Sequence, residues 1–287
     1  MTDYKLMRER WRELVVAVLI IANFLVWVAV LGHREGKLEV SFLDIGQGDA
    51  IFIETPSHKH VLLDGGPNKK VLAELGKLMS FGDKRIDVMI ESHPDKDHIG
   101  GLLEVVSRYD VGIFLEPGVE SENSLDDELH LRLENKKVDT LLARRGQIIN
   151  FGDGVKLIIL FPNTDVSKWE TNDASIVAKL VYGEESFLLT GDSTMKAENI
   201  LLNLNSTILK SSVLKVGHHG SKTSTSRAYA EAVSPTYAII SAGKDNSYGH
   251  PHQITLDTLR SVGSQILSTI DLGTITLETD GKILKIR

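Results

Sequence analysis

The chain has 287 residues, of which 42% are hydrophobic and 25% are charged. These proportions are ordinary for a globular protein, and the length allows one or two domains. The absence of cysteine excludes disulfides, thiolate metal ligands and cysteine nucleophiles, so a metal site must use His, Asp, Glu or Asn. The net charge is −7; residues 1–37 carry +2, which leaves −9 for the remainder and argues against non-specific binding of duplex nucleic acid.

Residues 14–31 form an uncharged apolar run, LVVAVLIIANFLVWVAVL. As a helix rising about 1.5 Å per residue, the run spans roughly 27 Å, close to the bilayer hydrocarbon thickness of about 30 Å. Cationic residues gather before it, so the positive-inside rule places residues 1–13 in the cytoplasm and the rest of the chain outside. We therefore predict a single-pass anchor in the cell membrane. A cleaved signal peptide and a buried core helix are the alternatives.

From residue 38 onward, short apolar runs end in glycine turns and alternate with helical patterns. The spacing predicts strands at 38–45, 50–54, 61–64, 86–92, 111–116, 156–161, 175–182, 186–190, 213–216 and 237–241, and two or three more within 265–285. It predicts helices at 68–80, 99–108, 194–204, 226–232 and 254–262. Two β-rich halves with interleaved helices indicate one α/β domain over 38–287, with two packed mixed sheets flanked by helices.

The segment 92–98, Ser-His-Pro-Asp-Lys-Asp-His, gathers ligand-type residues between a buried strand and a Gly-Gly pair. In an extended loop His93, Asp95 and Asp97 alternate to one side, whereas Asp97 and His98 point in different directions. One loop of this kind serves two ions about 3.5–4 Å apart. We predict His93 and Asp95 on a first divalent ion, and Asp97 and His98 on a second. A charged surface loop is the alternative.

Three later strands also end in ligand-type residues: Asp192 after the first, the pair His218-His219 after the second, and His250 after the third. Each is a weak signal alone, since Asp192 also suits a helix N-cap and a histidine pair also suits a surface turn. Together they place metal ligands at several strand ends. We expect His218 to be a ligand and His219 to be the less favoured member of the pair, behind the ligands.

Two earlier carboxylates have two interpretations each. Asp64 ends a strand beside the ligand loop and is expected to orient a ligating histidine through its other ring nitrogen. Asp49 has the same expected role. The alternative for both is a turn aspartate next to glycine.

Hydroxyl-bearing residues gather just before the predicted helix at 226–232. The hydroxyls of Ser221, Thr223 and Ser224, with free backbone N–H groups at a helix N-terminus, suit a phosphate oxygen. Lys222 belongs to this expected substrate-binding set, and Lys215 and Arg227 add positive charge nearby. An ordinary helix cap is the alternative.

These motifs together resemble the metallo-β-lactamase superfamily, and within it the extracytoplasmic hydrolase domain of ComEC-type competence proteins. The resemblance covers the chain from about residue 40 to its end. It rests on H-x-D-x-D-H at 93–98, LDIGQGDA at 43–50, LDGG at 63–66, NDAS at 172–175, LTGD at 189–192, KVGHHGS at 215–221 and GHP at 249–251.

The resemblance implies an αββα fold with Asp192 as the carboxylate that bridges two ions. It also implies catalytic roles for Asp97 and for His250, the latter as a further ligand or as a proton donor to the leaving group. The usual second histidine of the family is Asp95 here, and its third histidine is replaced in the stretch around Asn172, whose ligand atom stays open. Carboxylate in place of imidazole favours harder ions, so we expect Mn²⁺ or Zn²⁺.

Three functions fit these features. The first is a membrane-anchored phosphodiesterase or nuclease that uses a metal-activated water on nucleic acid or another phosphodiester. The second is a hydrolase of lactam, lactone or thioester substrates, whose sites keep three histidines more often. The third is a non-catalytic, membrane-anchored binding module. The resemblance leaves protein partners and a role in DNA uptake open.

Overall fold

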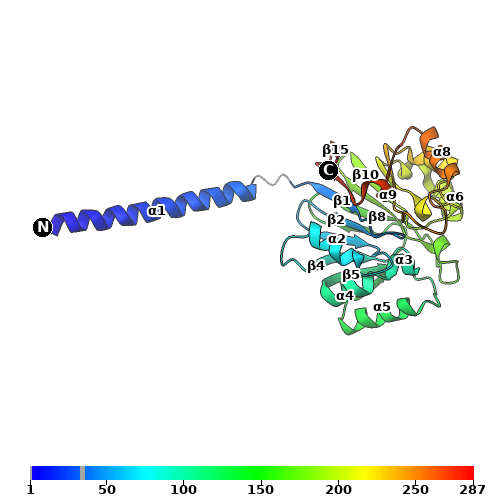
Figure 1. The fold of residues 1–287 in the computed structure, drawn as a ribbon, viewed down its shortest axis with the longest axis horizontal. Coiled ribbons are helices and arrows are strands. Elements are labelled where there is room, and N and C mark those ends of the chain that lie inside the picture. Colours follow the sequence, from blue (N-terminus) through cyan, green and yellow to red (C-terminus); the bar gives the residue numbers. More distant parts are fainter. Residues whose placement is uncertain (1, 33–35) are drawn as a thin grey trace. The chain divides into compact units, whose positions relative to one another are not determined.

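The computed structural model describes residues 2–32 and 36–287 (Figure 1). Its contacts divide the chain into two units, Met1–Lys37 and Leu38–Arg287. In the first unit, helix α1 runs over Thr2–Gly32, and its side chains are described only for residues 10, 11 and 13–26. Across the described residues, no helix combines the length and the apolar character that a membrane crossing requires. The anchor at 14–31 is therefore not confirmed and stays a prediction from the sequence.

The second unit contains a first sheet of eight strands in the order β15-β14-β1-β2-β3-β4-β5-β6. Strands β3 to β6 are parallel to one another, and the other neighbours in this sheet are antiparallel. The bounds are β1 Leu38–Phe42, β2 Ile51–Glu54, β3 His60–Leu63, β4 Arg85–Ile90, β5 Asp110–Glu116, β6 Asp139–Leu142, β14 Ile275–Thr279 and β15 Leu284–Ile286.

A second sheet of seven strands has the order β13-β12-β11-β10-β9-β8-β7. Here β10 to β13 are parallel and β7 to β10 are antiparallel, so both sheets are mixed as predicted. The bounds are β7 Ile148–Asn150, β8 Lys156–Phe161, β9 Val177–Tyr182, β10 Glu185–Leu189, β11 Val213–Lys215, β12 Tyr237–Ile240 and β13 Gln265–Ser268.

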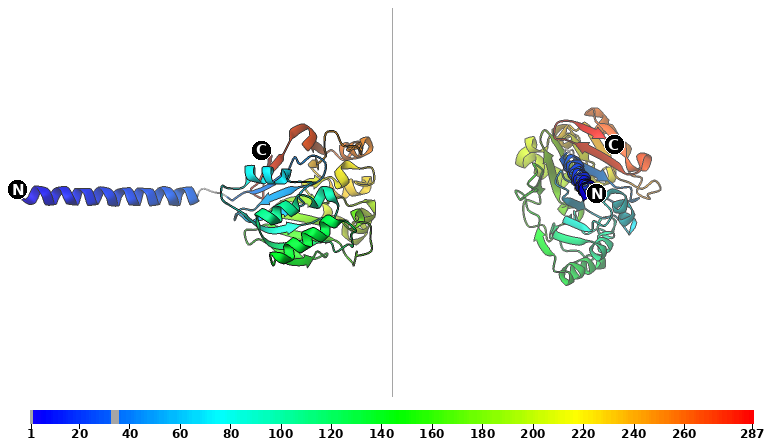
Figure 2. Two further views of the ribbon diagram at one scale, coloured as in Figure 1. Left: turned by 60° about the horizontal axis from the view of Figure 1, so that its bottom comes forward. Right: turned by 90° about the vertical axis from the view of Figure 1, so that its left-hand side faces the viewer.

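Helices cover the outer face of each sheet (Figures 1 and 2). Helices α2, α4 and α5 bury leucine and valine side chains against the first sheet, and α6, α7 and α8 do so against the second. The helix bounds are α2 Lys70–Leu78, α3 Lys96–Ile99, α4 Leu102–Arg108, α5 Ser124–Asn135, α6 Met195–Asn205, α7 Arg227–Val233, α8 Gln253–Ser261 and α9 Thr269–Leu272. Three short 3₁₀ turns are η1 Asn172–Ala174, η2 Ser206–Leu209 and η3 Gly217–Gly220.

The central core lies between the two sheets. Side chains such as Phe42 and Ile53 from the first sheet pack there with Leu157 and Phe187 from the second, all almost fully buried. The central strands of each sheet are therefore buried on both faces, which agrees with the near-continuous apolar runs of the sequence. The predicted αββα sandwich is confirmed for the second unit.

Glycine allows the close backbone approach that brings the loop after β3 against the loop after β4. A Cβ atom on Gly101 would lie 2.0 Å from the backbone oxygen of Gly65. The hydrogen bond from the backbone N–H of Gly101 to the backbone oxygen of Gly66, 2.8 Å long, depends on this approach. The two loops carry Asp64 and His98, so the glycine contact fixes how near these side chains lie.

We expect Gly101→Ala to lower the free energy of unfolding by about 1–3 kcal/mol, because the added methyl group overlaps backbone that cannot move aside cheaply. The matched control is Gly76→Ala in the exposed part of α2, where a Cβ meets nothing within 4 Å. That substitution should raise the free energy of unfolding by about 0.5–1 kcal/mol. Urea denaturation of both variants measures the difference; equal effects would contradict the packing argument.

Candidate metal centre

Loops at the carboxyl ends of four strands meet at one end of the sandwich. Asp64 follows β3 and the segment 92–98 follows β4 in the first sheet, while Asp192 follows β10 and His219 follows β11 in the second. The carboxyl ends of parallel strands are where sites form in α/β proteins. The site therefore draws side chains from both sheets.

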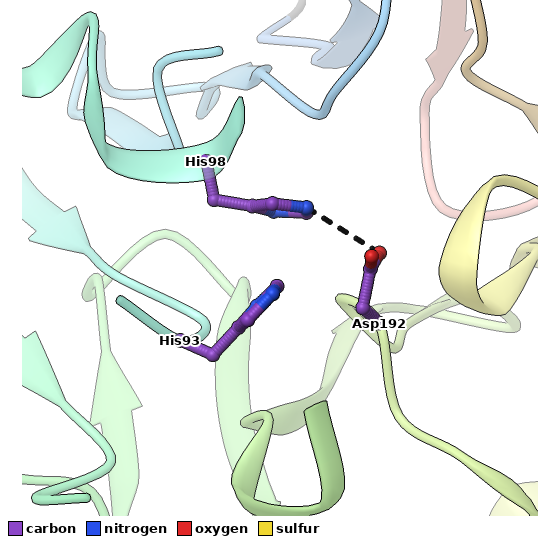
Figure 3. A group of neighbouring side chains, drawn as sticks. All are labelled: His93, His98 and Asp192. Atoms are coloured by element: carbon purple, nitrogen blue, oxygen red, sulfur yellow. Dashed lines mark ion pairs between the residues drawn. The ribbon is translucent and has the colours of Figure 1, made fainter. Parts of the chain in front are cut away.

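Histidine and aspartate side chains converge there. His93, His98 and Asp192 form one group, and Asp97, His98 and His219 another; within each group one ligand-type atom per residue lies within 4.8 Å of the others. The Nε2 atom of His98 is 3.4 Å from Oδ1 of Asp192, and Nε2 of His219 is 3.3 Å from its Oδ2. Figure 3 shows the rings of His93 and His98 pointing toward the Asp192 carboxylate.

Each of the three rings is held through its Nδ1 atom. The His98 Nδ1 donates to Oδ2 of Asp64 over 2.8 Å. The His219 Nδ1 donates to the backbone oxygen of Ser241 over 2.9 Å. The Ser92 hydroxyl donates to Asp64 over 2.7 Å and can accept from the Nδ1 of His93 over 3.0 Å. With the proton on Nδ1, the lone pair of every Nε2 is directed into the cluster.

Those Nε2 atoms have no hydrogen-bond partner among the described residues, and neither does Oδ1 of Asp192. The three histidines and Asp192 are also almost completely buried. Buried polar atoms are normally hydrogen-bonded, so several unpaired acceptors facing one point need a cation. Imidazole nitrogen and carboxylate oxygen are common ligands of divalent metals, and the cluster fits such an ion.

The charges of the cluster shift the pKa values of its members. Burial alone would lower the pKa of His98, but Asp192 and Asp64 outweigh it and hold that pKa well above its ordinary value. Burial would also lower the pKa of His219, but Asp192 and Asp49 outweigh it and hold that pKa well above the ordinary value. Burial would raise the pKa of Asp192, but His219 and His98 hold it well below the ordinary range. The carboxylates thus attract a cation, whether a proton on imidazole or a metal ion.

Asp97 lies at the open side of the cluster, where a third of its side chain is exposed. Its Oδ2 atom is 3.4 Å from Nε2 of His219. Burial alone would raise the pKa of Asp97, but the nearby ring of His219 and the charge of His98 lower it far below the ordinary value. Asp97 is therefore an ionised carboxylate that faces both the buried ligands and the solvent.

A buried ion pair lies behind His219. The Nζ atom of Lys215 is 2.5 Å from Oδ2 of Asp49, and neither side chain is exposed. Oδ1 of Asp49 is 3.4 Å from Nδ1 of His219, which agrees with the expected position of Asp49 behind a histidine. Lys215 was expected to add charge to a phosphate site; its burial against Asp49 corrects that expectation.

The roles expected for the histidine pair are exchanged. Nε2 of His218 is 3.8 Å from Asp192, its side chain is 23% exposed, and it belongs to none of the described ligand groups, whereas His219 is buried among them. The cause is the backbone, because His218 and His219 have φ values of +49° and +52°. The left-handed turn rotates His219 inward, which strand alternation does not predict.

Three other expected site residues lie around the cluster. Oδ2 of Asp95 is 3.6 Å from Nε2 of His93, but 40% of the Asp95 side chain is exposed and it joins no described ligand group. Asn172 begins the turn η1, and its buried Oδ1 atom has no hydrogen-bond partner in the described part of the chain. His250 places its ring 5.5 Å from that of His218 and 6.3 Å from that of His219, centre to centre.

The electrostatics of His250 disfavour its expected role as a proton donor. Burial and the neighbouring rings of His219 and His218 lower its pKa to about 4. His250 is therefore a neutral imidazole near pH 7, and its buried Nδ1 has no hydrogen-bond partner among the described residues. A neutral ring can ligate a metal or accept a hydrogen bond, but only a small fraction of such rings carry the extra proton that a general acid gives to a leaving group.

The hydroxyl-rich segment before α7 binds a carboxylate of the protein itself, and not the substrate phosphate predicted for Ser224. The buried carboxylate of Glu198 accepts hydrogen bonds from the Ser224 hydroxyl, from the backbone N–H of Thr225 and, over 2.9 Å, from that of Ser226. An anion therefore already occupies these donors, which corrects the phosphate site expected at Ser224. Ser221 and Thr223 lie on the cluster side, where the Thr223 hydroxyl is 3.2 Å from Nδ1 of His218.

Sequence reasoning missed Ser92, Ser241 and Glu198 as supports of the site. Ser92 could have been predicted from its place directly before His93, because a hydroxyl next to a metal-ligating histidine can form a hydrogen bond with its ring. The backbone oxygen of Ser241 has no sequence signal. The buried Lys215 could have been found from a lysine inside the apolar run Val213 to Val216.

The family model of the metallo-β-lactamase superfamily matches residues 43–244, a range that includes the strand-end loops carrying Asp64, 92–98, Asp192 and His219. The chain belongs to the metallo-β-lactamase superfamily. It is 32% identical over 269 residues to ComE operon protein 3 of Bacillus subtilis and 32% identical over 256 residues to competence protein ComA of Neisseria gonorrhoeae. Each match covers 88% of this chain and 34% of the relative, so the chain spans about a third of their length. The predicted resemblance to ComEC-type proteins is confirmed.

Solved structures share the fold at low identity. The diiron β-hydroxylase CmlA from Streptomyces venezuelae aligns with a TM-score of 0.56 and 16% identity, over 84% of this chain and 54% of that one. The metallo-β-lactamase fold protein YhfI from Bacillus subtilis aligns with a TM-score of 0.55 and 11% identity, over 84% of this chain and all of that one. These likenesses establish the fold of this superfamily member.

The neighbouring histidines provide a matched test of the centre. We expect His219→Ala to weaken divalent-metal binding by more than about 100-fold, beyond the 10–100-fold that loss of an outer partner costs. His218→Ala should change it by less than about threefold. Calorimetric titration of Mn²⁺ and Zn²⁺ into the metal-free full chain measures both. The reverse ranking would show that the inward position of His219 does not decide binding.

The raised pKa values of His98 and His219 predict opposite pH trends with and without metal. In metal-free protein, the stabilisation from these two protonated rings is complete below about pH 6.5, their unfolded pKa, and is lost as pH rises through the raised folded pKa. In metal-loaded protein, stabilisation by the ion grows with pH, because the ion displaces those protons. Thermal unfolding between about pH 6 and pH 9, with chelator or with Zn²⁺, should show the trends diverge; parallel curves would contradict the electrostatic account.

Proposed function

We propose that the protein is a metal-dependent phosphodiesterase that acts as a nuclease. The observation that carries the proposal is the set of buried, unpaired Nε2 atoms that face the ionised carboxylates Asp192 and Asp97. Such a set suits divalent ions at a centre that opens to solvent through Asp97. Within the superfamily, that arrangement supports hydrolysis by a metal-activated water.

Two neighbouring metal positions fit the side chains. We propose that Asp97, His98 and His219 hold one ion, and that His93 with Asp95 contributes to a second. Asp192 lies between the positions, since one of its oxygens faces His98 and the other faces His219. This assignment exchanges His218 for His219 relative to the expectation from the sequence and leaves His250 and Asn172 at the edge of the centre.

Divalent ions held by these residues would supply a nucleophile at neutral pH, because divalent metals lower the pKa of bound water from about 15.7 to about 7. The protein residues hold the geometry. Asp64 and Ser241 fix the rings of His98 and His219 through Nδ1, which leaves each Nε2 facing the cluster and available to a metal ion. Asp97 adds negative charge on the solvent side, and the neutral His250 offers a hydrogen-bonding ring beside the substrate.

The carboxylates favour Mn²⁺ more than a site with three histidines per ion would, although Zn²⁺ also suits the imidazoles. We therefore propose Mn²⁺ or Zn²⁺ as the cofactor. Asp95 in place of a histidine also favours this function over hydrolysis of lactams, lactones or thioesters, because enzymes for those substrates more often keep three histidines at the first metal site.

The choice of a nucleic-acid substrate is supported by the relatives of the chain. They include competence protein ComA and, at 32% identity over 241 residues, recombination protein 2 of Haemophilus influenzae. Recombination is a reaction of nucleic acid, so these relatives favour a nucleic-acid substrate over a lactam or thioester. The body of the chain is acidic, so the metal ions must provide much of the positive charge that a polyanion needs. Attachment to a membrane through residues 14–31 stays a separate prediction from the uncharged run.

We expect the purified full chain to cleave single-stranded DNA with added Mn²⁺, and Asp97→Ala to reduce kcat/KM by at least about 100-fold because an ionised ligand and its charge are removed. Asp139→Ala is the matched control, since it removes the same side chain from the exposed edge strand β6. Gel-based cleavage assays with and without chelator measure the activity.

Two outcomes would count against this proposal. A metal-loaded chain that cleaves no nucleic acid and no bis(p-nitrophenyl) phosphate, but opens a lactam, lactone or thioester, would favour the alternative chemistry. A chain that binds less than about one ion after reconstitution would favour a non-catalytic binding module.

A further inference from the structure

An exposed aromatic ring stands beside the proposed centre. Tyr248 is 65% exposed, and its ring stacks on that of His250 with a centroid separation of 5.5 Å and an angle of 21° between planes. His250 in turn lies 6.3 Å from His219, centroid to centroid. Tyr248 is thus connected to the proposed metal ligand His219 through the ring of His250. Tyr248 has no role in the proposed metal centre itself.

Hydrogen bonds of Asn246 and Gly243 hold the loop that carries Tyr248 in place. The side-chain amide of Asn246 donates to the backbone oxygens of Gly243 and His250, and its oxygen accepts from the backbone N–H of His250. The backbone N–H of Gly243 also donates to the side-chain oxygen of Gln47, over 3.2 Å. These bonds close the loop on both sides of Tyr248. An exposed tyrosine on a fixed loop loses little conformational entropy when it binds a ligand.

A cationic residue lies next to the same row of rings. The backbone N–H of Lys222 donates to Nδ1 of His252 over 3.2 Å, and the His252 ring lies 5.0 Å from that of His250. Lys222 is exposed and makes no described ion pair. An exposed aromatic face therefore lies near the backbone of an exposed lysine, and aromatic rings with nearby positive charge are the features with which proteins bind single-stranded nucleic acid.

We infer that Tyr248 stacks on an unpaired base of the substrate, next to the phosphate that occupies the metal centre, and that the protein therefore prefers single-stranded over duplex nucleic acid. This inference rests on the proposed nuclease function and names its substrate class. A base in a duplex has both faces covered by its neighbours, so only an unpaired or unstacked base can lie on Tyr248. Because every base has a π face, the contact selects strandedness and not sequence.

The contact also predicts which kinetic constant changes. Stacking on a base away from the reacting phosphate stabilises the bound substrate and the transition state alike, so its loss raises KM and leaves kcat unchanged. A loss of one base stack corresponds to a rise of about tenfold in KM. A structural role for Tyr248 would instead alter kcat or metal content.

The test compares Tyr248→Ala and Tyr248→Phe with the parent full chain, loaded with Mn²⁺, on a labelled single-stranded oligonucleotide and its duplex. Tyr248→Ala should raise KM on the single strand about tenfold, with kcat, metal content and Tm unchanged, and should reduce the preference over duplex. Tyr248→Phe keeps the ring and should behave like the parent chain. The matched control is Phe81→Ala, which removes a fully exposed aromatic ring from the opposite end of β4.

A series of oligonucleotides with a single abasic residue locates the contact. In the parent chain, one abasic position at a fixed distance from the cleaved phosphate should raise KM about tenfold, and Tyr248→Ala should show no further loss on that oligonucleotide. Equal losses at every abasic position, or an additive effect of the two changes, would overturn the inference.

A binding measurement separates failure of this inference from failure of the proposed function. Fluorescence anisotropy of the same oligonucleotides reports binding without cleavage. Cleavage that is independent of Tyr248 overturns the stacking contact and retains the nuclease. Binding that depends on Tyr248 without cleavage retains the contact and overturns the nuclease. A metal-loaded chain that neither binds nor cleaves nucleic acid overturns both, and assigns Tyr248 to contact with another partner.

Discussion

The structure depends on the requirement that three buried imidazole nitrogens remain unpaired and face one point. Each of His93, His98 and His219 uses Nδ1 for a protein acceptor, and none of their Nε2 atoms has a hydrogen-bond partner among the described residues. An unsatisfied buried polar group costs about 1–3 kcal/mol. A fold that accepts this cost three times, with a carboxylate in the same place, is arranged for a cation.

Maintaining that arrangement requires backbone that the rest of the fold must hold in place. Asp64, His218 and His219 all have positive φ, a conformation that costs about 1–3 kcal/mol for a residue other than glycine. The surrounding packing determines these positions. The loop of Asp64 is pressed against the loop of His98 through Gly65 and Gly101, and the carboxylate of Asp64 also accepts the backbone N–H of Ser92. One aspartate thereby orders the start of the ligand loop and orients its last histidine.

Periodicity and motif spacing predicted most of this architecture. The strands and helices that carry the site have strong apolar runs bounded by glycine, so their positions differ from the structure by only a few residues. Helix α5 was missed because only Leu129 and Leu133 are buried along its twelve residues, which leaves little periodic signal. The edge strand β6 was missed because all four of its residues are exposed.

The sequence predicted the site residues that lie together in one loop. It predicted less well those residues whose position depends on the backbone conformation of a turn. The loop 92–98 and the role of Asp64 follow from residue types and from strand ends. His218 and His219 differ only by a left-handed turn that the sequence does not show, so their order was reversed. Glu198 was missed because a buried carboxylate that caps Ser224, Thr225 and Ser226 belongs to α6, some 26 to 28 residues earlier in the chain.

The buried ion pair between Lys215 and Asp49 joins the two sheets beside this centre. Asp49 belongs to the first sheet's β1–β2 loop and Lys215 to β11 of the second, so their contact joins the two halves beneath His219. A well-packed apolar pair often stabilises a core as much as a buried ion pair, whereas removal of one charge from the pair costs about 3–5 kcal/mol. Stability alone therefore does not require a lysine here. What an apolar pair cannot provide is a carboxylate oxygen 3.4 Å from Nδ1 of His219, balanced by a fixed charge on its other side. Burial alone would raise the pKa of Asp49, but Lys215 and His219 hold it below the ordinary value, so the lysine helps to keep this carboxylate ionised beside His219.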